Sequence, residues 1–201
     1  MDNVKIVEEM IIKSLTELMG LTCEDNTKDA RSNLIFPKYR NNGGKRVSEQ
    51  EAKLLFVKQI ENNGTFLYSV ETPTEDSYSF SGENPRSGCI DMCLHEKNGS
   101  RIHLIEFKAK TPKQSSYSKD FEKLLCDTKN LTNYFIHILE DTDNGTIPSV
   151  EDKYREAYNN TVNKSEKKIQ SNLKIFLCDI GRTKEIRAYE FDDKGELNKI
   201  K

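Results

Sequence analysis

The chain has 201 residues, of which 32% are charged, and its formal net charge is -2 with an isoelectric point of about 6.0. This length predicts one domain with appendages, and the near-neutral charge excludes a global basic field for holding nucleic acid, so any such binding must use local patches. Because we find no signal peptide, no apolar stretch long enough to cross a membrane, and five cysteines without framework spacing, we expect a cytoplasmic protein in a reducing compartment, with no membrane contact.

An amphipathic helix is the first element that the sequence predicts. Its apolar residues recur at helical spacing and are Val4, Val7, Ile11, Leu15 and Leu18. Gly20 follows, at a position where helices commonly end. We expect the apolar face to pack on the core or on a second copy of the protein, which would form a homodimer through this helix. From residue 22 to 45 the sequence is polar and irregular, which predicts a flexible arm or a substrate-facing loop.

A second helix is predicted to begin at Ser48, because Ser48 and Glu51 have the spacing of a capping box. Its apolar residues are Ala52, Leu55, Phe56 and Ile60. On a helical projection Glu49 falls within the apolar sector, whereas Glu51 falls outside it and has the capping role available. The alternative is that both carboxylates serve only the positive end of the helix dipole.

Residues 65–72 have the composition of a β-strand, which Pro73 is expected to end. The polar stretch that follows contains Tyr78, Phe80 and Arg86 and leads to the next strand. We expect these side chains to stack on bases or to hold a phosphate, or else to pack within a hairpin.

Two further strands are predicted at residues 89–94 and 101–109, joined by the turn signal Asn98-Gly99. Residues two apart in an extended chain share a face, so one face contains Ile102, Leu104, Glu106 and Lys108. Pairing the two strands around the turn brings Asp91 beside Glu106. A buried charge has to be paired or to bind a metal, so this pattern indicates a site at the edge of the core.

Two carboxylates that converge on one point favour a hard divalent cation, Mg²⁺ or Mn²⁺. Such an ion polarises a phosphoryl oxygen and lowers the pKa of a bound water. The ammonium of Lys108, on the same face as Glu106, has three roles open to it: to orient the attacking water, to deprotonate it, or to offset charge that develops in the transition state. Asp91, Glu106 and Lys108 therefore predict a metal-dependent phosphodiesterase centre.

Asp91 followed by Glu106-Phe107-Lys108 resembles the motif of the PD-(D/E)XK nuclease superfamily, the restriction-endonuclease-like fold, although Ile90 stands where the family often has proline. The resemblance implies an α/β fold with a mixed central sheet flanked by helices. Its core of helix, three strands, helix and strand would cover about residues 47–140 of a nuclease-like domain at 47–201, which follows the helix and arm at 1–46. A C-terminal helix and a strand pair would complete the domain.

The same resemblance implies the roles of the site residues. Asp91, Glu106 and the Phe107 backbone carbonyl would bind Mg²⁺ or Mn²⁺, and Lys108 would assist the attacking water. Glu49 matches a further acidic residue that the family often places on the first core helix, near the metal. The implied partner is nucleic acid, with DNA favoured over RNA.

After the motif, Ser118 is expected to cap a helix with Phe121 and Leu124 inside and Asp120, Glu122 and Lys123 on its outer face. Residues 134–139 predict a fourth strand, parallel to the motif strand, with His137 as a core histidine rather than a ligand. A polar helix is expected at about residues 150–170. An antiparallel strand pair is expected at residues 173–178 and 186–191.

Two other interpretations stay open on the sequence. Glu-x-Lys also occurs at Glu51-Ala52-Lys53, Glu151-Asp152-Lys153 and Glu166-Lys167-Lys168, in polar stretches that we interpret as solvated helix faces. The motif can therefore arise by chance, in which case the chain is an unrelated α/β interaction domain. Separately, the near-neutral charge and the long N-terminal helix leave open a catalytically silent member of the fold that binds nucleic acid or a protein partner.

Overall fold

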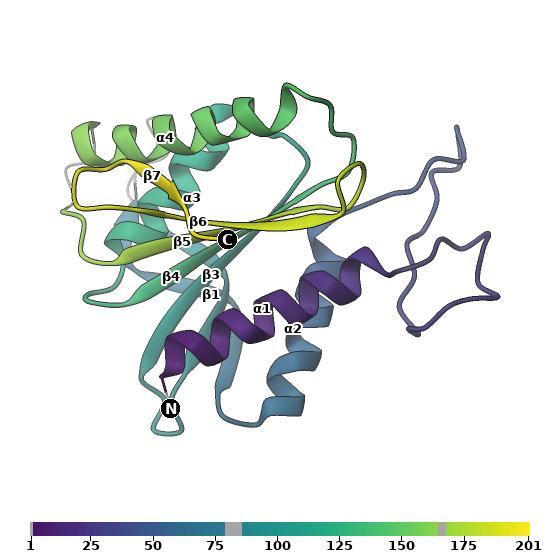
Figure 1. Ribbon diagram of the computed structural model, residues 1–201. Helices are drawn as coiled ribbons and strands as arrows, with labels where there is room; N and C mark the ends of the chain where they lie inside the picture. Colours follow the sequence, from purple (N-terminus) through teal and green to yellow (C-terminus); the bar gives the residue numbers. More distant parts are fainter. Residues whose placement is uncertain (1, 79–85, 165–167) are drawn as a thin grey trace.

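The computed structural model describes residues 2–78, 86–164 and 168–201 (Figure 1). The strands are β1 (Leu67–Tyr78), β2 (Arg86–His95), β3 (Arg101–Ala109), β4 (Thr132–Leu139), β5 (Asn172–Asp179), β6 (Glu185–Phe191) and β7 (Leu197–Lys199). The helices are α1 (Asn3–Met19), α2 (Glu49–Asn63), α3 (Gln114–Cys126) and α4 (Thr146–Lys164). The described chain is therefore a mixed α/β structure, and from α2 to β4 its elements follow the predicted order of helix, three strands, helix and strand.

The seven strands form one mixed sheet in which their order in space is their order in sequence. The strands from β1 to β3 are antiparallel neighbours, β3, β4 and β5 run parallel, and β6 and β7 add antiparallel strands. The parallel step from β3 to β4 passes through α3, as predicted for residues 134–139. Two hydrophobic clusters result, one under α1 and α2 and the other under α3 and α4, on opposite faces of the sheet (Figure 1).

Helix α1 begins after the Asp2 N-cap, and it ends at Gly20, where the sequence predicts its end. Its apolar face is buried, with Val7, Ile11 and Leu18 in the same cluster as residues of α2 and the sheet. This helix therefore packs on the core of its own chain, which leaves the predicted homodimer through α1 without support. Of the helices in the described ranges, none is long and apolar enough to cross a membrane.

Helix α2 has the predicted capping box. The Glu51 carboxylate accepts a hydrogen bond from the Ser48 backbone N–H at 3.0 Å, and the Ser48 hydroxyl accepts one from the backbone of the first turn. Gly64 ends the helix with a left-handed backbone, φ 67°, which glycine adopts without steric cost.

Two predicted boundaries were wrong. Strand β1 continues past Pro73 to Tyr78, because β1 is the outermost strand and an edge position tolerates a residue that has no N–H. Helix α3 begins at Gln114 instead of at Ser118, whose hydroxyl donates to the Gln114 carbonyl from within the helix. Phe80, expected either to contact substrate or to pack within the hairpin, lies outside the described residues.

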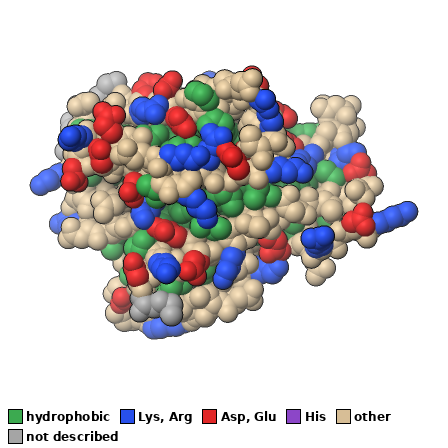
Figure 2. All heavy atoms as spheres, in the orientation of Figure 1, with side chains coloured by type: hydrophobic (Ala, Val, Ile, Leu, Met, Phe, Trp, Pro, Cys, Tyr) green, Lys and Arg blue, Asp and Glu red, His purple; other side chains and the backbone are tan. Residues whose placement is uncertain are grey.

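The C-terminal third also differs in its boundaries from the prediction. Helix α4 begins at Thr146, which is earlier than expected, and the short strand β7 was not predicted. The pair β5 and β6 is antiparallel, as expected. Figure 2 shows lysine and arginine side chains interspersed with aspartate and glutamate over one face of the molecule, in keeping with the near-neutral net charge.

The turn after β5 packs closely against the end of β4, and a substitution at Gly181 tests this contact. A Cβ atom on Gly181 would lie 1.7 Å from the carbonyl oxygen of Glu140, at the end of β4. We expect Gly181→Ala to lower the free energy of unfolding, measured by urea denaturation, by about 3 kcal/mol, because the backbone has to move. Gly145→Ala is the matched control, since its Cβ would meet nothing closer than 3.6 Å. Equal stability of the two variants would contradict the close approach.

Candidate functional site

The hairpin of β2 and β3 brings Asp91 and Glu106 to neighbouring positions. Regular pairing of the two strands includes Met92 with Ile105 and stops there, one step before Asp91 and Glu106 would be opposite each other. The Asp91 carboxylate instead accepts a hydrogen bond from the Phe107 backbone N–H at 2.7 Å. Asp91 thus takes the place of a backbone partner at the point where the strands separate.

Strand β3 places the rest of the motif on its two faces. Leu104 belongs to the cluster under α3, and Glu106 and Lys108 make their ion pairs with α3, whereas Phe107 packs on Phe56 of α2 with ring centroids 6.1 Å apart. The alternation predicted for β3 therefore holds over the motif. It was wrong for Ile102, which packs against the other cluster; the pairing with β2 shifts register near that end of the strand.

Two charged residues of α3 complete this side of the site. The Lys108 ammonium lies 2.7 Å from the Asp120 carboxylate, and the Lys123 ammonium contacts the carboxylates of Glu106 and Asp120. Asp120 and Lys123 were predicted on the outer face of α3, but both are buried. Asp120 follows Tyr117 by three residues, a helical spacing that identifies the buried face and was available in the sequence.

Helix α2 contributes a lysine and a glutamate from the opposite side. The Lys53 ammonium lies 2.9 Å from the Asp91 carboxylate and 4.0 Å from that of Glu71. Lys53 was predicted on a solvated face, but only 14% of its side chain is exposed. Glu49, one helical turn before Lys53, is half-buried, and burial together with repulsion by Asp91 raises its pKa. Glu49 therefore faces the cluster, as its place in the apolar sector suggested.

The environment raises the pKa of both motif residues of β3, which favours the neutral form of Glu106 and the charged form of Lys108. Burial raises the pKa of Glu106 well above its usual range, and repulsion by Asp120 adds to this, while Lys123 opposes it. Burial is the largest single influence on Lys108 and disfavours its charged form, but the carboxylates of Asp120, Glu106 and Glu49 together outweigh burial and raise the pKa. Lys108 is thus held as an ammonium, which favours orienting water or offsetting charge over accepting a proton.

The donor chemistry of this cluster fits a hard divalent cation. The cluster consists of the four carboxyl groups of Glu49, Asp91, Glu106 and Asp120 and the three ammonium groups of Lys53, Lys108 and Lys123. Oxygen donors with an excess of negative charge are what Mg²⁺ and Mn²⁺ select. The carboxylates are not gathered around one point: within the described ranges, no three acidic, cysteine or histidine side chains form a group that could hold a metal.

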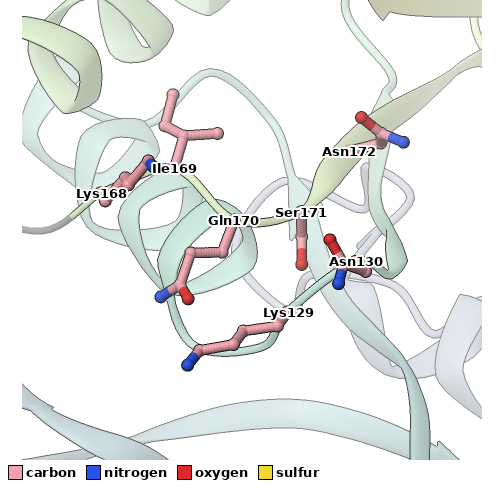
Figure 3. A pocket seen from close by; sticks show the side chains of 7 residues that line it. All are labelled: Lys129, Asn130, Lys168, Ile169, Gln170, Ser171 and Asn172. Atoms are coloured by element: carbon pink, nitrogen blue, oxygen red, sulfur yellow. The ribbon is translucent and has the colours of Figure 1, made fainter.

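A pocket of about 420 Å³ lies away from this cluster, at the beginning of β4 and β5 (Figure 3). Its lining includes Lys129, Lys168, Asn130 and Gln170 and contains none of the predicted site residues. Lys129 follows the C-terminal end of α3, where the helix dipole opposes a bound anion. We therefore assign no chemistry to this pocket.

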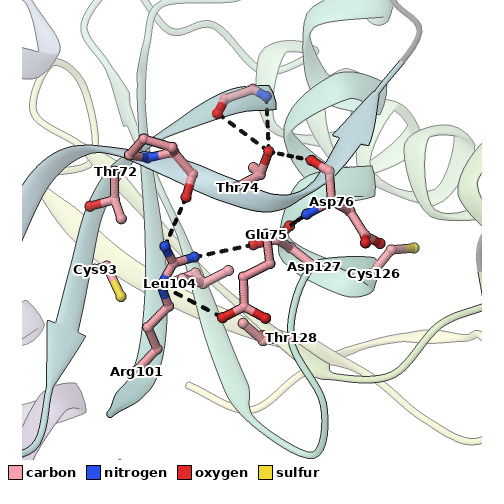
Figure 4. A network of polar contacts seen from close by, with 12 residues as sticks. Thr72, Thr74, Glu75, Asp76, Cys93, Arg101, Leu104, Cys126, Asp127 and Thr128 are labelled. Carbon is pink, nitrogen blue, oxygen red and sulfur yellow. Dashed lines mark hydrogen bonds and ion pairs between the residues drawn. The ribbon is translucent and has the colours of Figure 1, made fainter. Parts of the chain in front are cut away.

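A polar network ties the long hairpin of β1 and β2 to the end of α3 (Figure 4). The buried Asp127 carboxylate accepts hydrogen bonds from the Asp76 backbone N–H at 3.0 Å and the Tyr78 hydroxyl at 3.4 Å, and Arg101 lies 3.7 Å away. Of the two roles expected for Tyr78, substrate contact and packing within the hairpin, its burial in this network favours packing. The network holds β1, the strand that pairs with the Asp91 strand, against the end of the helix that carries Lys123.

Comparisons of the chain with protein-family models, with curated proteins and with solved structures found no match.

His137 lies opposite Lys108 in the pairing of β3 and β4, and it is a buried core histidine, as predicted. Its Nδ1 is 2.6 Å from the Tyr154 hydroxyl, and its Nε2 contacts the Lys110 carbonyl. A carbonyl only accepts, so Nε2 carries the proton and Nδ1 accepts from the tyrosine. His137 therefore connects α4 to the end of the motif strand.

Burial lowers the pKa of His137 from 6.5 to about 4. Above pH 6.5 both folded and unfolded states hold neutral imidazole. As the pH falls from 6.5 towards 4, only the unfolded state binds the proton, so the folded state loses up to about 3 kcal/mol of stability. We expect His137→Gln to reduce this loss, measured as the free energy of urea unfolding at several pH values. An unchanged slope in the variant would contradict the assignment.

Proposed function

We propose that this protein is a Mg²⁺- or Mn²⁺-dependent nuclease that hydrolyses phosphodiester bonds. One observation supports this most: Asp91 and Glu106 lie at the point where β2 and β3 separate, with Lys108 on the same face of β3 as Glu106. An acidic pair with an ammonium beside it provides for binding an ion and for countering charge on a phosphate.

Each residue has a distinct part in the proposed reaction. Asp91, Glu106 and the Phe107 carbonyl would hold the ion, and Glu49 would face it from α2. When bound, such an ion would supply Lewis acidity towards the phosphoryl oxygen and would lower the pKa of a bound water. Lys108 offsets the negative charge that develops on the phosphate, and Asp120, at 2.7 Å, holds the Lys108 ammonium in position.

The substrate we propose is nucleic acid, with DNA favoured over RNA. The chain lacks a net positive charge, so binding has to use residues close to the site. The polar arm before α2 reaches the end of the motif strand, where the Lys110 ammonium donates to the Tyr39 hydroxyl at 2.8 Å. Arg40, next in the arm, has 92% of its side chain exposed. Arg40 also lies 3.9 Å from Glu24, and we propose that Arg40, Lys110 and Tyr39 contact a phosphate and a base of the substrate.

A second candidate function is a catalytically silent protein that binds nucleic acid or a protein partner. The observation that favours it is the pairing of both predicted ligands with lysines, Asp91 with Lys53 and Glu106 with Lys123. A cluster that is permanently neutralised would need no metal. This function predicts binding of a partner that is equally strong in EDTA and in a Glu106→Ala variant.

The test of the proposed function is cleavage of labelled single- and double-stranded DNA and RNA in Mg²⁺, Mn²⁺ or EDTA. We expect cleavage that requires the metal and that Glu106→Gln slows by roughly a hundred-fold or more, because a neutral amide is a poor ligand. Lys108→Met should also slow it. Glu96→Gln is the matched control, since Glu96 is exposed at the far end of the same hairpin.

The proposal fails if the wild-type protein cleaves none of these substrates in either metal. It also fails if Glu106→Gln cleaves as fast as Glu96→Gln.

A further inference from the structure

The Lys123 ammonium is enclosed by oxygen atoms. It donates to the Cys89 backbone carbonyl at 2.9 Å, lies 3.2 Å from one oxygen of Asp120, and contacts the Glu106 carboxylate. Only 10% of its side chain is exposed. Three oxygens from β2, β3 and α3 around one buried positive charge have the composition of a cation site, occupied here by a side chain of the protein itself.

The two buried carboxylates next to Lys123 require a cation at the position of its ammonium group. Glu106 and Asp120 are both buried, with 3% and 6% of their surface exposed. Two buried carboxylates next to each other are unfavourable unless a cation lies between them. Asp120 uses its second oxygen to hold Lys108, so Lys123 is the cation that neutralises Glu106.

We propose that Lys123 is the resident cation of the site and that a divalent metal ion binds Glu106 by displacing it. This inference rests on the proposed function for the identity of the incoming ion. Asp120 gives the displaced ammonium a second partner, because it contacts Lys123 through a different oxygen from the one nearest Lys108. Lys123 can therefore leave Glu106 and the Cys89 carbonyl while it stays paired with Asp120.

Lys53 is less suited to this role, although it pairs with the other predicted ligand. Its second partner is Glu71, which is exposed and 4.0 Å away, so Lys53 has one close carboxylate and no enclosing set of oxygens. The exposed fraction of its side chain, 14%, is close to the 10% of Lys123, so the difference lies in the number of oxygens around the ammonium. The buried contact that limits metal binding is thus the one made by Lys123.

The first experiment measures Mn²⁺ affinity from the electron paramagnetic resonance signal of the free ion. We expect Lys123→Met to bind Mn²⁺ roughly ten-fold or more tightly than the wild type, because the competing charge is gone. Lys123→Arg keeps the charge and should not gain affinity. Lys58→Met removes a lysine of α2 that is paired with Glu17 and 52% exposed, and it should match the wild type. Unchanged or weaker binding by Lys123→Met would overturn the proposal.

The second experiment uses the wild-type protein and does not depend on the folding of a variant. Lysines are acetylated with acetic anhydride in EDTA or in saturating Mn²⁺, and the rate at each position is read by mass spectrometry. We expect Lys123 to react slowly in EDTA and several-fold faster in Mn²⁺, while the exposed Lys58 reacts equally in both. Equal protection of Lys123 in both conditions, with Mn²⁺ bound, would contradict displacement.

The two proposals fail separately. Tighter Mn²⁺ binding by Lys123→Met in a protein that cleaves no nucleic acid would support the resident cation and reject the nuclease. Metal-dependent cleavage by the wild type, with no gain in affinity in Lys123→Met, would do the reverse.

Discussion

The buried pairing of charges between β3 and α3 is the constraint on which the rest of the site depends. Glu106 and Lys108 alternate with apolar residues on a central strand, so folding buries Glu106 fully and Lys108 in part. Asp120 and Lys123 satisfy them from α3, and removal of one partner from such a buried set typically costs about 3–5 kcal/mol. The packing of α3 on the sheet, in which Tyr117 is fully buried, therefore also determines which charges lie next to Glu106 and Lys108.

The extended part of the site can be predicted from the sequence because a β-strand has a simple period. Alternation in β3 is enough to place Glu106 and Lys108 on one face, and the Asn98-Gly99 turn fixes the partner strand that carries Asp91. The helical part was missed because charged residues were assigned to solvent by their type. Their spacing carried the better signal, since Lys53 lies one turn after Glu49 on the same side of α2.

Other features depend on contacts between distant parts of the chain and have no local signal. Serine residues often cap helices, but the chain is already helical before Ser118. Its hydroxyl therefore donates to the Gln114 carbonyl within the helix. In the sequence Tyr78 lies in a polar stretch that resembles a loop, and its hydrogen-bond partner Asp127 is 49 residues later in the chain. The length of β1 likewise depends on which neighbour it pairs with, since Pro73 is compatible with an edge strand and not with a central one.

The outer position of β1 has a consequence for how the protein behaves among other chains. Exposed strand edges recruit further strands and so begin aggregation. Pro73 offers no N–H to an incoming strand, and Glu71, with φ 47°, interrupts the extended backbone and adds a charge. The opposite edge is β7, which has only three residues and is too short to act as a template. Both margins of the sheet therefore carry features that hinder the addition of a further strand.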